Sequence, residues 1–135
     1  MNVRTRICVA ALAGVAVGAA VVEGVRAQAK PPAQARPPAY YVSQIELTGD
    51  ADTYVKNYAS QVPGTVEPFG GRFLVRGGKV TRLEGDTPRP RIVVIVFENI
   101  DKAQAWYSSP AYQKIAPVRQ SVAKTNSFIV EGPTN

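Results

Sequence analysis

Apolar and polar residues alternate along residues 40–47, where Tyr41, Ser43, Ile45 and Leu47 share one face. A period of two residues is typical of a strand with one buried face, because successive side chains of a strand point to opposite sides. The tyrosines, valine and isoleucine in this stretch also favour β structure. The pattern predicts a first strand.

The spacing changes to three and four residues after Asp50. Apolar residues then stand at Ala51, Tyr54, Val55, Tyr58, Ala59 and Val62. This spacing is typical of a helix with one buried face, and Asp50 can cap its amino end. Pro63 and Gly64 are expected to weaken or end the helix.

Two short β-favouring stretches, residues 72–76 and 80–83, flank Gly77, Gly78 and Lys79. Glycine adopts positive φ angles at little cost, as tight hairpin loops require. The pattern predicts a strand followed by a return arm.

Residues 92–97 form a continuous apolar run, Ile-Val-Val-Ile-Val-Phe, preceded by Pro88, Pro90 and Arg91. Continuous rather than alternating apolar residues indicate a strand covered on both faces. We expect this strand at the centre of the sheet.

Helical spacing returns at Ile100, Ala103, Trp106 and Tyr107, and residues 108–110, Ser-Ser-Pro, interrupt it. A second helical segment is expected over residues 111–124, with a kink at Pro117, because proline disturbs a helix interior. Phe128, Ile129 and Val130 predict a short last strand.

The resulting order predicts an α+β fold of the ferredoxin-like βαββαβ type, with a four-stranded antiparallel sheet and an extra hairpin arm. Helices packed on one side cover only one face of such a sheet. The run at 92–97 requires cover on both faces. We therefore expect a homodimer through the open sheet face, forming a dimeric α+β barrel.

The amino-terminal segment has the three parts of a secretory signal peptide. Arg4 and Arg6 precede an uncharged run over residues 7–22, and residues 27–29, Ala-Gln-Ala, match a cleavage signal. The run is shorter than the roughly 20 residues of a spanning helix, although an uncleaved anchor is the alternative. Cleavage after Ala29 predicts an exported protein, periplasmic or secreted, with no stable membrane anchor.

The remaining chain divides into a proline-rich linker at 30–38, a domain at 39–132 and a tail at 133–135. Four prolines among residues 30–38 favour an extended spacer, and a ligand of a proline-recognition domain is the alternative.

Composition restricts the chemistry. The 135 residues include 16 basic and 10 acidic ones, no histidine and one cysteine, Cys8. An internal disulfide, a thiolate metal cluster and histidine-based triads are therefore excluded within one chain, and we expect no metal site and no cofactor. Six basic and two acidic residues lie within 72–91, which makes this segment the basic part of the domain.

Two groups of residues are candidates for ligand binding. Trp106, Ser109 and Tyr112 gather at the helix break, where the alternatives are core packing and a pocket mouth. Ser109 either supplies a hydroxyl there or caps the next helix.

Arg72, Arg76 and Arg91 form the second group, with Arg119 as a weaker addition. In a regular strand Arg72 and Arg76 share a face. They can bind a small anionic ligand, pair with Glu84 or Asp86 of a partner chain, or remain solvated. Glu84 and Asp86 themselves have the spacing of solvated loop acids.

Several motifs resemble the domain-of-unknown-function family 1330. They are residues 69–78 (FGGRFLVRGG), 83–85 (LEG), Arg91 with 93–95 (VVI), and 105–113 (AWYSSPAYQ) with Arg119. The resemblance covers residues 40–132 and implies a dimeric ferredoxin-like α+β barrel, in the superfamily of cofactor-independent monooxygenases. Val96 and Ala111 stand where the family often has glutamate.

The sequence thus favours an exported dimeric barrel that binds a small, acidic or aromatic molecule in a pocket. The alternative is a cofactor-independent monooxygenase or isomerase on the same scaffold, in which the protein positions the substrate and supplies an acid or base. The basic charge alone suggests nucleic-acid binding, which export and the absence of a recognised motif oppose. We therefore expect no nucleic-acid partner.

Overall fold

The structure is a computed structural model and describes Gly14, Gly18 and residues 35–134. The expected signal peptide and residues 30–34 of the expected linker lie outside this part, apart from the two glycines. The strands are β1 (Ala39–Leu47), β2 (Arg72–Arg76), β3 (Arg91–Phe97) and β4 (Ala123–Glu131). The helical segments are α1 (Ala51–Tyr54), the π-helical turn η1 (Val55–Ala59), α2 (Val62–Val66), the 3₁₀ turn η2 (Glu67–Phe69), α3 (Ile100–Tyr107) and α4 (Pro110–Val122).

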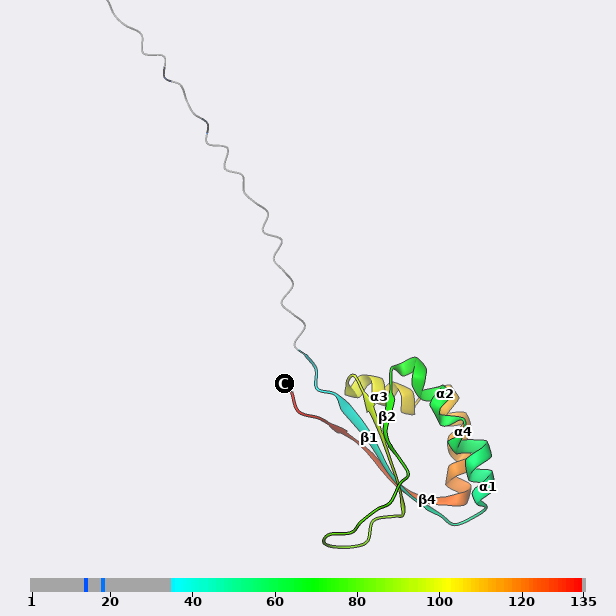
Figure 1. The fold of residues 1–135 in the computed structure, drawn as a ribbon. Helices are drawn as coiled ribbons and strands as arrows, with labels where there is room; N and C mark the ends of the chain where they lie inside the picture. The colour runs from blue at the N-terminus through cyan, green and yellow to red at the C-terminus, as the bar shows by residue number, and fades with distance from the viewer. Residues whose placement is uncertain (1–13, 15–17, 19–34, 135) are drawn as a thin grey trace, which may run out of the picture. The chain divides into compact units, whose positions relative to one another are not determined.

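The four strands form one antiparallel sheet in the order β2-β3-β1-β4. Figure 1 shows the labelled helices on one side of this sheet. The order is that of the ferredoxin-like fold, in which two β-α-β units interleave. The predicted α+β class, the antiparallel sheet and the central position of β3 are confirmed.

The first helical region is longer than its sequence predicts. Asp50 caps α1 as expected, since its carboxylate accepts a 2.8 Å hydrogen bond from the backbone N–H of Thr53. Pro63 and Gly64 do not end the helical region, since both lie within α2, but a turn at residues 60–61 interrupts the helix just before them. Proline fits the first turn of a helix, where its missing N–H leaves no hydrogen bond unmade.

The predicted return strand at 80–83 is absent from the structure, and a loop connects β2 directly to β3. Gly77 and Gly78 do adopt the expected positive φ angles of 70° and 137°. The backbone N–H of Gly77 then donates to the carbonyl of Ile92 in β3. Leu83 is 87% exposed, so a strand here would bury little apolar surface. The extra arm is therefore a projecting loop, visible between β2 and β3 in Figure 1.

The carboxyl-terminal half follows the predicted order with shifted boundaries. Ser108 and Ser109 separate α3 from α4 as expected, and α4 continues through Pro117. It ends at Val122, two residues before the expected end at Lys124. Strand β4 has nine residues instead of three, because its polar first half pairs with β1 as regularly as its apolar second half.

The core lies between the helices and one face of the sheet. Its largest fully buried side chains include Trp106, Tyr54, Tyr112, Phe97 and Ile95. The other face of the sheet is open in the single chain, and Ile92, Val94 and Val96 of β3 remain partly exposed on it. No helix in the described part of the chain is long and apolar enough to cross a membrane.

Candidate functional site

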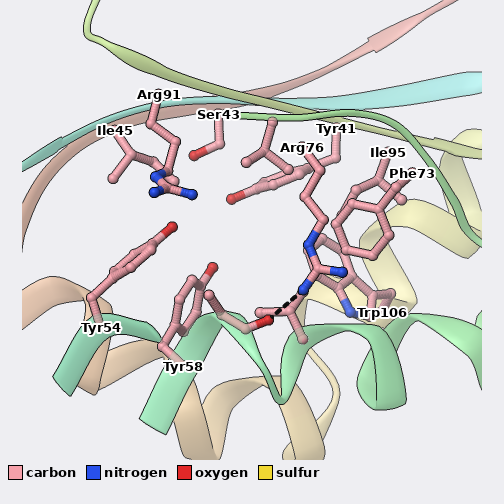
Figure 2. A pocket seen from close by; sticks show the side chains of 13 residues that line it. Tyr41, Ser43, Ile45, Tyr54, Tyr58, Phe73, Arg76, Arg91, Ile95 and Trp106 are labelled. Atoms are coloured by element: carbon pink, nitrogen blue, oxygen red, sulfur yellow. Dashed lines mark hydrogen bonds between the residues drawn. The ribbon is translucent and has the colours of Figure 1, made fainter. Parts of the chain in front are cut away.

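A pocket lies between the sheet and the first helical region. Its polar lining consists of Tyr41, Ser43, Tyr54, Tyr58, Arg76 and Arg91. Apolar walls come from residues such as Ile45, Phe73, Ile95 and Trp106. Figure 2 shows the guanidinium of Arg91 and the hydroxyls of Tyr41, Ser43, Tyr54 and Tyr58 pointing into the same hollow.

Strand register explains why these side chains converge. Tyr41 pairs with Ile95, Ser43 with Val93 and Ile45 with Arg91. Paired residues of an antiparallel sheet point to the same face, so all of them face the helices. Tyr54 and Tyr58 are four residues apart and project from one side of the helical segment opposite. The alternation along the strands and the four-residue spacing of Tyr54 and Tyr58 thus bring side chains of the sheet and of the helical layer together in one site.

Arg91 lies at the first position of β3 and is half-buried. Its Cζ atom lies 5.3 Å from the centre of the Tyr54 ring, within the range of a cation–π interaction. The sequence-predicted candidate Arg91 therefore lines the pocket.

Arg76 also lines the pocket, but Arg72 does not. The expectation that both arginines share a face is wrong, because a register shift between Phe73 and Val75 inserts an extra residue into β2. Such a bulge moves the following side chains to the opposite face. Arg72 pairs with Val96 on the open face of the sheet.

Two contacts hold the Arg76 side chain at the edge of the pocket. Its Nη2 donates a 2.8 Å hydrogen bond to the carbonyl of Ala59 in η1. Its Cζ atom lies 4.8 Å from the centre of the Phe73 ring. Figure 2 shows the resulting bridge from the strand to the helical layer. Because Arg76 is exposed, its movement can widen the entrance.

Trp106 forms a fully buried wall of the pocket. Its indole N–H donates a 3.0 Å hydrogen bond to Oγ1 of Thr65. Its ring stacks on Phe97 with centroids 5.4 Å apart, and meets the ring of Tyr41 edge-on at 4.9 Å. The candidate Trp106 therefore belongs both to the core and to the pocket, the two alternatives left open by its spacing.

Tyr112 and Ser109 lie behind the pocket. The hydroxyl of Tyr112 lies 3.1 Å from the hydroxyl of Tyr58, which does line it. Ser109 caps α4, since its Oγ accepts a 3.3 Å hydrogen bond from the backbone N–H of Tyr112. The structure thus brings together Arg76, Arg91 and Trp106 of the six candidates. It leaves Arg72, Ser109 and Tyr112 out of the lining.

Burial favours the neutral, protonated form of three tyrosines in or behind the pocket. It raises the pKa of Tyr58 to about 12, and it also raises the pKa values of Tyr54 and Tyr112. At neutral pH these hydroxyls are neutral and retain a proton to donate.

The residues lining the pocket include two arginines and no carboxylate. The cavity volume is about 30 Å³, enough for about two water molecules. The arrangement offers positive charge and hydrogen-bond donors in a narrow apolar cleft. These groups favour a negatively charged or hydrogen-bond-accepting group, and the present volume admits only groups of the size of water.

The reasoning from sequence missed the hydroxyl groups of Tyr41, Ser43, Tyr54 and Tyr58. Their signals were present, because Tyr41 and Ser43 alternate on one strand face and Tyr54 and Tyr58 are four residues apart. Each pattern by itself indicates only a buried face and does not show that the hydroxyls converge on a pocket.

Solved structures of similar fold include proteins with and without a known activity. A protein of unknown function from Rhodopseudomonas palustris has a TM-score of 0.61 at 13% identity, over 74% of this chain and 85% of that one. A hypothetical protein from Arabidopsis thaliana has a TM-score of 0.55 at 13% identity, over 76% and 94%. SnoaB, a cofactor-independent oxygenase from Streptomyces nogalater, has a TM-score of 0.51 at 10% identity, over 73% and 96%.

At these identities the similarity shows a shared fold and not a shared activity. A search of curated proteins gave no match. The family described as "Domain of unknown function (DUF1330)" matches residues 38–133, which include every strand and helix of the domain. The family expected from the sequence motifs is confirmed, and the chain belongs to the DUF1330 family.

Proposed function

We propose that this protein binds a small acidic aromatic molecule in the pocket between its sheet and its first helical region. The observation that carries the proposal is the lining itself. Arg76 and Arg91 supply two guanidinium groups, several tyrosine and serine hydroxyls point inward, and no lining residue is acidic. A guanidinium binds a carboxylate through two parallel hydrogen bonds, and the aromatic walls suit a planar ring.

The narrow cavity limits the size of this ligand. Organic ligands occupy pockets of roughly 300 to 1,000 Å³. The present volume of about 30 Å³ therefore requires side chains to move before a ring can enter. Arg76 is exposed and Arg91 half-buried, so both can turn toward the carboxylate while the ring passes between them.

Native mass spectrometry of the purified protein tests the proposal. We expect a small acidic compound to remain bound to the wild type and to be lost from Arg91→Met. Arg89→Met is the matched control, because Arg89 pairs with Glu46 on the surface, outside this pocket. Equal retention by both variants, or retention of neutral compounds only, would contradict the proposal.

The open sheet face supports a homodimer as the working assembly. Val75, Val94, Val42 and Phe128 follow one another across the four strands in a continuous row. Phe128 is 46% exposed and Val75 40% exposed in the single chain. Burying such a row against the same row of a second copy satisfies two-fold symmetry and removes an apolar patch from water.

Export to the periplasm or the medium is also part of the proposal. It rests on the three-part signal at residues 1–29. Mass spectrometry of the protein from fractionated cells tests it. A mature chain starting at Lys30 outside the cytoplasm is expected, and a full-length chain confined to the cytoplasm would contradict export.

A second candidate function is cofactor-independent oxygenation or isomerisation of a phenolic substrate. The proton-donating tyrosines of the pocket and the fold shared with SnoaB support it. Oxygen consumption with small phenols, compared between wild type and Trp106→Phe, tests this candidate. Equal rates, both at the level of the buffer, would contradict it.

A further inference from the structure

Arg119 in α4 is a buried charge without a carboxylate partner. Its residue exposure is 4%. The ion pairs found among residues 35–134 join Arg36 to Asp101 and Arg89 to Glu46, and neither involves Arg119. Its Nε atom also has no hydrogen-bond partner. A buried charge normally has a counterion, because removing it from water is costly.

The surroundings of Arg119 are tyrosines. Its Cζ atom lies 5.6 Å from the centre of the Tyr58 ring. Burial alone lowers the pKa of an arginine, but the neighbouring Tyr112 and Tyr58 outweigh burial and raise the pKa of Arg119. Because arginine is not deprotonated in proteins, the guanidinium is charged, directly behind the pocket wall that Tyr58 forms.

The donors and acceptors of Arg119, Tyr112 and Tyr58 indicate which hydroxyl in this cluster donates its proton to which oxygen. The guanidinium, whose Cζ lies 5.6 Å from the Tyr58 ring centre, acts on the two tyrosines through its positive charge, which favours a Tyr112 oxygen turned toward it and a Tyr112 proton turned away. Tyr112 then has its own proton free for the Tyr58 oxygen, 3.1 Å away. Tyr58 in turn has its proton free for the pocket, into which its hydroxyl points in Figure 2.

We propose that Arg119 and Tyr112 are positioning residues that turn the Tyr58 hydroxyl into a donor for an oxyanion of the ligand. This deepens the proposed function, on which it rests, by assigning the ligand a phenolate oxygen. The charge of Arg119 polarises the hydroxyl chain, and hydrogen bonds in a chain strengthen one another. Arg76 and Arg91 line the same pocket and add to its positive charge, and the hydroxyls of Tyr41 and Tyr54 are the other titratable groups facing it.

4-Nitrophenol is a suitable probe, because its absorbance separates the phenolate from the neutral phenol. 4-Nitroanisole has the same ring and cannot ionise. We expect the wild type to bind the phenolate about tenfold tighter than the neutral phenol, the ratio expected for a hydrogen bond to a charged group. Absorbance titration with pH gives this ratio, and quenching of Trp106, the single tryptophan, gives the affinity for both probes.

Tyr58→Phe is expected to lose most of the tenfold preference, and Tyr112→Phe a severalfold part of it. Arg119→Lys is expected to retain more of the preference than Arg119→Met, because lysine keeps the charge and a donor. All variants should bind 4-nitroanisole with wild-type affinity. Tyr107→Phe is the control, since its ring packs on Tyr112 but its side chain does not line this pocket.

Three results would overturn the inference, and they differ in what else they overturn. Binding of both probes with an unchanged phenolate preference in Tyr112→Phe and Arg119→Met would overturn the positioning role and leave the proposed function standing. An equal loss of affinity for both probes would show a merely structural role. Failure of the wild type to bind either probe would overturn the phenolate assignment, and only the further loss of benzoate binding in the wild type would overturn the proposed function as well.

Discussion

The indole N–H of Trp106 donates a buried 3.0 Å hydrogen bond to Oγ1 of Thr65, 41 residues earlier in the chain. This bond fastens α3 to α2 and fixes one wall of the pocket. Thr65 donates its own proton to the carbonyl of Val62 at 2.7 Å, so its oxygen is free to accept from the indole.

Thr65→Val should therefore destabilise the domain by leaving the indole N–H buried without a partner. An unpaired buried donor costs about 1–3 kcal/mol. Trp106→Phe should cost more, since it also leaves a cavity. The two changes combined should cost less than the sum of the single changes, because they remove the same bond. Urea unfolding followed by circular dichroism measures all three, and full additivity would contradict this role of the bond.

Gly71→Ala should destabilise the domain by about 1–3 kcal/mol, the usual cost of overpacking. A Cβ atom at Gly71 would lie 2.6 Å from Cε1 of Phe97 and closer still to Val66. Gly64→Ala is the matched control, because it lies inside α2 with nothing within 4 Å of the added atom. It should stabilise by about 0.5–1 kcal/mol, as alanine does within helices. Equal effects in chemical denaturation would show that the contact at Gly71 is not tight.

Stability should fall as the pH rises from 10 toward 12. Burial raises the pKa of Tyr58 from 10 to about 12, so above pH 10 the unfolded chain ionises this group before the native one does. The loss amounts to about 2–3 kcal/mol for Tyr58. Urea unfolding at several pH values measures it. Tyr58→Phe should flatten the decline, and an identical decline in that variant would contradict the assignment.

Val42→Lys should convert the proposed dimer to a monomer. Val42 lies in the middle of the apolar row on the open face, between Val94 and Phe128. A lysine at this position in each copy would bury two positive charges in the interface without counterions. Val55→Lys makes the same change at an exposed position of η1 and should leave the dimer intact. Analytical ultracentrifugation distinguishes the states, and a monomeric wild type would contradict the dimer.

Patterns of period two and period four were sufficient for much of the fold. They predicted β1, the capped α1, the strand β3 and the break between α3 and α4, because each depends on local spacing and composition. They failed where hydrogen-bonded pairing with a neighbouring strand decides whether a segment becomes a strand. The first half of β4 is polar and becomes a strand because β1 offers a complete edge. Residues 80–83 have suitable side chains and remain a loop.

The candidate site was predicted in part for the same reason. Arg76, Arg91 and Trp106 line the pocket, as a search for charged and aromatic residues suggests. The bulge in β2 that separates Arg72 from Arg76 depends on the register against β3. The five residues of β2 contain no periodic pattern that reveals this bulge. The burial of Arg119 likewise depends on how α4 packs against η1.

Titration of Trp106 fluorescence with benzoate and with benzyl alcohol tests whether the pocket selects an anionic ligand. Trp106 is the single tryptophan and lines the pocket, so its signal reports binding there. We expect saturable binding of benzoate, at least about tenfold tighter than that of benzyl alcohol, because a charge-assisted hydrogen bond adds to the affinity of the anion. Arg91→Met should remove this preference and Arg89→Met should keep it. Equal affinity for the two compounds, or a preference that survives in Arg91→Met, would contradict the account.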